Sequence, residues 1–235
     1  MRTVNRLGAI LGALLALSTG ISGSGRAAPA GLGERLTDPA SGYTLRGPAG
    51  WEARRGALEG VSLVFLGPAE GGFAANLSVV VVPEVITPTP RLVEQLARNL
   101  EAKMRGRKPA EGGAPDFRVT RRRVAPVAGA DAAYLESAFT RERPGGPAAF
   151  RQLQVIVPGP GEHYVLTYTA RAEAFDAWLP VIRAAVNSFT PGLGPARAEP
   201  PTPWHGRRAT RVLVGLMGVI LLGLALRQRR RGSRA

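Results

Sequence analysis

The sequence predicts an α+β domain in which a central antiparallel sheet carries two packed helices on its faces. Three observations predict this class: strand-like runs joined by short Pro-Gly turns, two segments with helical periodicity, and the order strands, helix, strands, helix. Short turns between successive strands favour antiparallel pairing. At 235 residues, the chain has room for one such domain beside targeting and anchoring segments.

The first half of the domain contains four candidate strands. Residues 41–46 alternate between apolar and polar side chains and end at a Gly-Pro turn, after which Trp51 begins a short second element. Residues 61–66 and 76–82 are the other two, and the second of these is apolar enough for a central strand. We therefore expect four strands before the first helix.

The first helix has a clear start signal, with Thr89 as N-cap and Pro90 at the first helical position. Apolar side chains then recur on one face, at Leu92, Val93, Leu96, Leu100 and Met104. The other face carries i,i+4 pairs of opposite charge, Glu94 with Arg98 and Glu101 with Arg105. This pattern predicts a helix that packs on the sheet by one side.

The second half of the domain repeats the order of strands and then helix. Four strands are predicted at residues 117–124, 132–140, 150–157 and 164–170. A final helix is predicted at residues 173–187, with one apolar stripe formed by Phe175, Trp178, Leu179, Ile182, Val186 and then Phe189. Pro180 is expected to kink this helix or to confine its regular part to the residues that follow.

The N-terminal residues 1–30 have the features of a signal peptide. Arg2 and Arg6 precede an apolar run over residues 7–17, and Ala28-Pro29-Ala30 offers the small-x-small pattern that precedes a cleavage site. The alternative is an uncleaved N-terminal anchor. Either segment predicts that the domain at residues 31–190 is exported.

Near the C-terminus, residues 191–211 form a Pro-rich linker and residues 212–226 an uncharged apolar run. As a helix this run is roughly 22 Å long, short of the hydrocarbon core of about 30 Å, so flanking arginines have to snorkel or the bilayer has to thin. The flanks are Arg211, Arg227, Arg229, Arg230 and Arg231. The basic tail at residues 227–235 predicts a single-pass transmembrane helix with a cytoplasmic C-terminus and the folded domain on the periplasmic or cell-surface side. A processed surface-sorting tail is the alternative.

The net charge of +14 is mainly a property of these terminal segments. Eleven of the 31 Lys and Arg residues lie in the leader or beside the apolar run, which leaves 20 against 17 acids. The chain has no cysteine, so disulfides, thiolate catalysis and cysteine-ligated metals are excluded. An exported chain with no aromatic interleaving among its basic residues also argues against nucleic acid as a partner.

No catalytic, cofactor-binding or metal site is predicted. The two histidines, His163 and His205, have no ligand set around them, and Ser62 and Ser78 lack a nucleophile-elbow pattern. Glu136 and Glu142 are expected to occupy ordinary solvated positions, and the four aspartates form no cation-binding motif. The chain is therefore predicted not to be an enzyme and to need no cofactor.

One possible contact surface is basic. Its eight residues are Lys103, Arg105, Arg107, Lys108, Arg118, Arg121, Arg122 and Arg123. Such a surface suits phospholipid headgroups or an acidic partner. The alternative is a solvated strand face in a chain that uses arginine far more than lysine.

Four short motifs follow one another along the chain in a specific order and spacing. They are Gly42-Tyr-Thr-Leu-x-x-Pro-x-Gly-Trp51, Asn76-Leu-Ser-Val79, Tyr164-Val-Leu-Thr167 and Ser188-Phe189. Over residues 38–190, this series resembles the PsbP and DcrB-like family. The resemblance implies an α/β/α sandwich with a central antiparallel sheet, in exported or membrane-associated proteins that bind or help to assemble other proteins. It supplies no catalytic residues, and the C-terminal anchor departs from the commoner lipoprotein or soluble arrangement.

The sequence thus predicts a membrane-tethered extracytoplasmic module that binds or assembles an envelope protein near the membrane. The alternative is a carrier of a small apolar or lipid-like ligand in a cavity between sheet and helix. The aromatic and aliphatic stripe of the final helix motivates that alternative.

Overall fold

The computed structural model describes residues 31–70, 72–109, 112–143 and 145–193. The predicted signal peptide, the apolar run at residues 212–226, the basic tail and most of the linker lie outside the described residues. Neither helix in the described ranges is long and apolar enough to cross a membrane.

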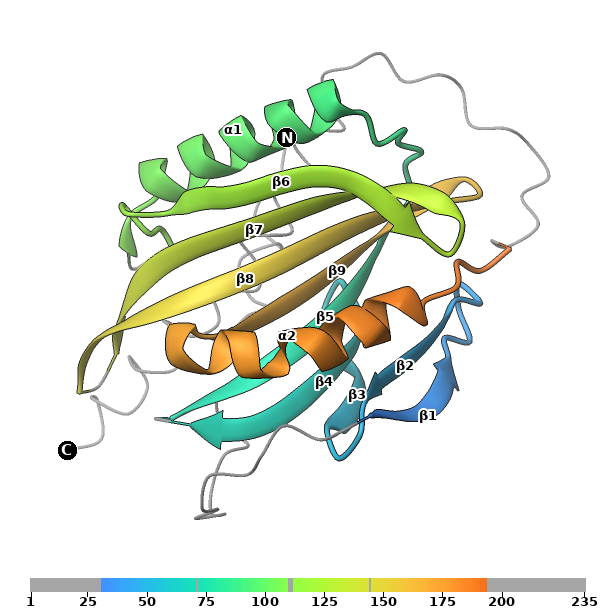
Figure 1. Ribbon diagram of the computed structural model, residues 1–235, viewed down its shortest axis with the longest axis horizontal. Coiled ribbons are helices and arrows are strands. Elements are labelled where there is room, and N and C mark those ends of the chain that lie inside the picture. The colour runs from blue at the N-terminus through green and yellow to red at the C-terminus, as the bar shows by residue number, and fades with distance from the viewer. Residues whose placement is uncertain (1–30, 71, 110–111, 144, 194–235) are drawn as a thin grey trace, which may run out of the picture.

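A seven-stranded antiparallel sheet forms the centre of the domain (Figure 1). Its strands, in spatial order, are β3 (Glu52–Leu58), β4 (Val61–Glu70), β5 (Phe73–Val82), β9 (Glu162–Arg171), β8 (Gly146–Gly159), β7 (Ala130–Arg143) and β6 (Arg118–Val127). Two antiparallel meanders, β3 to β5 and β6 to β9, join where β5 pairs with β9. The sheet confirms the predicted α+β class.

A two-stranded ribbon, β1 (Leu32–Thr37) with β2 (Thr44–Pro48), lies beside the main sheet. The prediction of four strands before the first helix was wrong, because β1 was not recognised and the described chain has five there. Arg46 of β2 holds the ribbon together, since its Nε donates to the Gly33 carbonyl at 2.9 Å. The ribbon is also tied to the end of the domain by the bridge between Thr44 and Thr190.

Helix α1 (Pro90–Gly106) forms as its sequence predicts. The Thr89 hydroxyl accepts a hydrogen bond from the Leu92 N–H at 3.2 Å, so the N-cap is confirmed. Both predicted charge pairs are present, at 3.2 Å between Arg98 and Glu94 and at 3.7 Å in the second pair. The buried face of the helix consists of Val93, Leu96, Ala97, Leu100 and Met104.

Helix α2 (Ala172–Asn187) continues on both sides of Pro180, so the expectation that this proline confines the regular part to later residues was wrong. The proline removes one helical hydrogen bond, and packing compensates for that loss. Phe175 and Trp178 before it and Ile182 after it are all buried against the sheet. The whole predicted stripe, through Phe189, lies in the core.

The two helices cover opposite faces of the sheet, which gives the α/β/α sandwich. Neighbouring residues of one strand belong to different hydrophobic clusters: Leu63 and Phe65 join α2, whereas Val64 joins α1. Helix α1 contacts β6 and β7, and α2 contacts β2, β8 and β9. In Figure 1, α2 lies in front of the sheet and its C-terminal end lies next to the ribbon.

Candidate functional site

Strand β6 lies at one edge of the sheet and, among the described strands, pairs only with β7. Its register shifts by one residue between Val119 and Arg121, so that Arg121 stands opposite Glu136 and Arg123 opposite Tyr134. Directly opposed residues of an antiparallel pair share a face. Both arginines therefore lie on the face that α2 covers, since Tyr134 belongs to the α2 cluster.

The arginine between them belongs to the other face. Arg122 stands opposite Leu135, which packs in the α1 cluster, and its guanidinium donates to the Glu94 carboxylate of α1. One run of three arginines thus supplies cations to both sides of the sheet.

The remaining predicted basic residues are distributed along α1, its following loop and the start of β6. Arg105 donates through Nε to the Phe117 carbonyl at 2.7 Å, and thus links α1 to the start of β6. Burial and the neighbouring Arg107 lower the pKa of Lys103 to about 8. Lys108 and Arg118 are exposed. The structure therefore divides the predicted eight-residue surface between the two faces of the sheet.

An arginine-lined groove of about 300 Å³ is bounded by residues of β6 and β7 and by Arg183 of α2. We call it the arginine groove, and its lining residues are Arg121, Arg122, Arg123, Tyr134, Glu136 and Arg183. Four arginine residues and one glutamate thus contribute to the lining, although the guanidinium of Arg122 pairs with Glu94 on the α1 side. Arg183, which sequence reasoning did not select, comes from α2.

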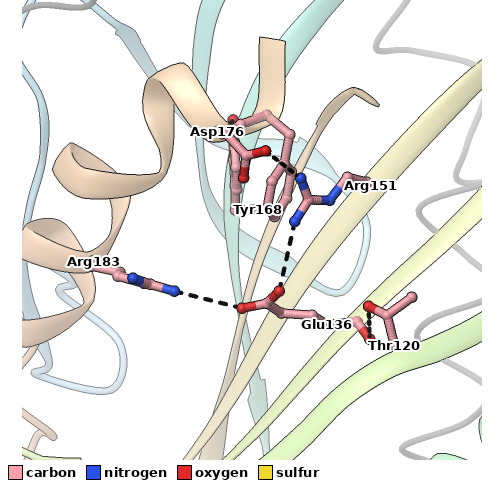
Figure 2. A network of polar contacts seen from close by, with 7 residues as sticks. Thr120, Glu136, Arg151, Tyr168, Asp176 and Arg183 are labelled. Carbon is pink, nitrogen blue, oxygen red and sulfur yellow. Dashed lines mark hydrogen bonds and ion pairs between the residues drawn. The ribbon is translucent and has the colours of Figure 1, made fainter. Parts of the chain in front are cut away.

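Glu136 is the centre of the polar network at this groove (Figure 2). Its carboxylate lies 3.6 Å from Arg183 Nη2 and 3.8 Å from Arg151 Nη2, beyond hydrogen-bonding distance in both cases. Arg151 also pairs with Asp176 at 2.6 Å and lies over the Phe175 ring. Figure 2 shows Arg183 and Arg151 approaching the carboxylate from different directions.

The expectation that Glu136 is an ordinary solvated residue was wrong, because only 8% of it is exposed. The strand period explains the difference. Residues 134 and 136 share a face, and Tyr134 is in the core, so alternation along β7 turns Glu136 toward α2. Glu142, near the end of the same strand, is exposed as expected.

The two strand arginines keep most of their donors unused. The guanidinium of Arg123 lies over the Tyr134 ring at 4.6 Å, and Arg121 has no ion-pair partner among the described residues. Stacking engages the face of a guanidinium and leaves the N–H groups in its plane available. Burial raises the pKa of Tyr134, with opposing effects from Arg123 and Arg183, so its phenol keeps its proton at neutral pH.

His163 and Ser62, two of the residues considered for catalysis, are engaged in other contacts. His163 is 1% exposed, and its Nδ1 lies 2.7 Å from the Glu84 carbonyl; burial lowers its pKa. Ser62 donates to the Asp38 carboxylate at 2.7 Å rather than to a histidine. In the described ranges, no cluster of three His, Asp or Glu side chains could hold a metal ion, and His205 lies outside those ranges.

Comparison with known proteins gave structural neighbours only. No protein-family model matches the chain, and no curated protein matches its sequence. PsbP from Synechocystis sp. PCC 6803 is 16% identical with a TM-score of 0.43, over 73% of this chain and 97% of that one. LpqN, described as involved in cell envelope biogenesis of Mycobacterium tuberculosis, is 13% identical with a TM-score of 0.43, over 68% and 90% of the two chains. A Bacteroides thetaiotaomicron protein is 11% identical with a TM-score of 0.44, over 68% and 48%.

The solved structures similar to this chain therefore include PsbP, the protein whose family the sequence motifs resemble. At such identities and TM-scores, no activity or partner carries over from these proteins to this chain.

Proposed function

We propose that this chain is a membrane-tethered, extracytoplasmic binding module without enzymatic activity, and that it contacts an anionic partner through the arginine groove. One observation carries the proposal: Arg121, Arg123 and Arg183 gather around a single buried carboxylate, Glu136. The local excess of positive charge attracts anions, and the low-dielectric wall formed by sheet and helix strengthens that attraction.

The position of the groove suits contact with a partner. It lies at an edge of the sheet, and the side chain of Arg183 is about half exposed (48%). Arginine is effective at such sites because its planar fork loses less freedom per hydrogen bond than a lysine does. An anion reaching the groove therefore meets arginine donors from both β6 and α2.

The membrane tether is the second part of the proposal and comes from the sequence. Residues 212–226 would anchor the chain, and the Pro-rich linker at residues 191–211 would tether the domain to that anchor. A domain on such a tether would meet partners at or near the bilayer surface.

The alternative role, as carrier of an apolar ligand, was suggested by the apolar stripe of α2, and the structure gives that stripe another use. The α2 stripe that suggested a cavity is used in packing, since Trp178 lies edge-on to Trp51 at 5.2 Å and Phe175 stacks on Tyr168 at 4.9 Å. The groove found beside α2 is lined by charged side chains instead.

Photo-crosslinking in intact cells tests the contact surface. A photoreactive residue in place of Arg118, which is exposed at the start of β6, is expected to capture a partner. The adduct should disappear when Arg121 and Arg123 are both changed to Glu. A probe in place of the exposed Arg91 on α1 is the matched control. Identical adducts from both probes, or an adduct that survives the charge reversal, would disprove the contact at the groove.

Cysteine labelling tests the topology, because the chain contains no cysteine of its own. A membrane-impermeant maleimide is expected to label Thr202→Cys in intact cells and to label Ser233→Cys only after permeabilisation. Labelling of both positions in intact cells would contradict a cytoplasmic C-terminus.

A further inference from the structure

We infer that the arginine groove binds a phosphate group, which Arg121 and Arg123 of β6 and Arg183 of α2 hold together. This inference rests on the proposed function and deepens it by naming the chemistry of the anion. A phosphate can reach the groove as a lipid headgroup or as a free ion, and both present the same oxygen atoms to the guanidinium groups.

The arrangement of the donors favours a tetrahedral anion. Arg121 and Arg123 lie two positions apart on one face of β6, which places their Cα atoms about 6.6 Å apart along the strand. Arg183 comes from a different element, α2. A planar carboxylate is satisfied by one or two guanidinium forks, whereas the oxygens of a phosphate point in several directions and accept from more donors.

The carboxylate already in the groove does not use up these donors. Glu136 stands 3.6 Å from Arg183, at ion-pair rather than hydrogen-bond distance, and its Oε2 has no hydrogen-bond partner among the described residues. Its other cation, Arg151, is shared with Asp176. Arg121 and Arg123 have no carboxylate of their own in the described ranges, so they are free to coordinate an incoming anion.

Glu136 also sets where the anion binds. A negative charge buried at the base of the groove repels a second anion, so the phosphate is placed at the mouth, on the N–H groups that face away from the carboxylate. Removing that charge is therefore expected to tighten binding, which is the opposite of what removing an arginine does.

The experiment uses the purified full chain in nonionic detergent, titrated with inorganic phosphate, dihexanoyl phosphatidylglycerol, dihexanoyl phosphatidylcholine or citrate at constant ionic strength. Binding is followed by calorimetry and by ³¹P line broadening. We expect saturable binding of phosphate, of the phosphatidylglycerol, or of both. The Arg121→Gln variant should bind at least tenfold more weakly, and Arg91→Gln should bind like the wild type. Arg121 has no ion-pair partner in the described ranges, so this variant is expected to fold normally.

The titrations with inorganic phosphate and with phosphatidylglycerol distinguish the two sources of the phosphate group. Binding of the anionic lipid alone supports a headgroup site, and binding of inorganic phosphate supports a site for the free ion. Absence of saturable binding, equal binding of citrate, or equal affinity of wild type and Arg121→Gln would overturn the inference. Citrate binding that depends on Arg121 would overturn the phosphate assignment and leave the proposed anionic partner intact. A Glu136→Gln variant that folds and binds phosphate more weakly would contradict the placement at the mouth.

Discussion

The arginines on the two faces of strand β6 differ in whether the opposing helix supplies an acceptor for them. On the α1 side, Arg122 pairs with Glu94, and the Val119 N–H donates to the Glu101 carboxylate at 2.7 Å, so the helix supplies an acceptor for each group. On the α2 side, Arg121 and Arg123 face a single carboxylate that two other arginines already approach. On this strand, the two arginines proposed to bind an anion are those for which the opposing element supplies no acceptor of their own.

The largest expected effect comes from loosening α2, which supplies Arg183. Trp178→Ala removes a buried side chain packed on Trp51 and should cost about 3–5 kcal/mol in unfolding free energy, because a cavity remains. Leu100→Ala in α1 should cost about 2–5 kcal/mol. Urea unfolding followed by circular dichroism measures both. If the variants remain folded, anion binding should weaken for Trp178→Ala and persist for Leu100→Ala.

Charge reversal on the α2 side should abolish anion binding. With both Arg121 and Arg123 changed to Glu, we expect a loss of about a hundredfold in affinity, since two attractions become repulsions. Reversal of Arg122 alone should leave affinity within a few fold, because its guanidinium is already paired with Glu94. Calorimetric titration compares the variants. A larger loss from the Arg122 reversal would contradict the division of the strand into two faces.

The ion pair on the α1 side should have a small effect on stability. Both side chains are more than a third exposed, so a double-mutant cycle of Arg122→Gln with Glu94→Gln should give a coupling of at most about 1 kcal/mol. High salt should reduce it further. A coupling of several kcal/mol would mean that this pair is as important to the fold as the buried contacts.

A pH dependence of stability is also expected from Lys103. Its pKa is about 8 in the folded chain and about 10.5 in the unfolded chain, so the unfolded chain binds more protons between these values. Stability should therefore rise with pH from about 8 to 10.5, and the destabilising contribution is fully present below pH 8. In urea unfolding at several pH values, this rise should be smaller for Lys103→Met. An unchanged profile in the variant would show that Lys103 is not its source.

Local signals predicted much of the fold. The Thr89 cap, Pro90 and the spacing of apolar residues determine α1, and the stripe from Phe175 to Val186 determines α2, because helix formation depends on contacts three and four residues apart. The strands β4 to β9 were found for a similar reason, since alternation and turn residues are visible along the chain. The ribbon strand β1 was missed because its side chains are mostly half-buried or exposed and show no clean alternation.

Other features depend on partners distant in the sequence. The pairing of β5 with β9 joins segments about 90 residues apart, and the shift between Val119 and Arg121 decides which arginines face Glu136. Arg183 reaches the groove only because α2 packs across the same face. Local sequence patterns were enough for both helices, for most of the strands and for the number of charges. Which charges meet was settled by the tertiary structure, because register and packing depend on long-range contacts that no local pattern encodes.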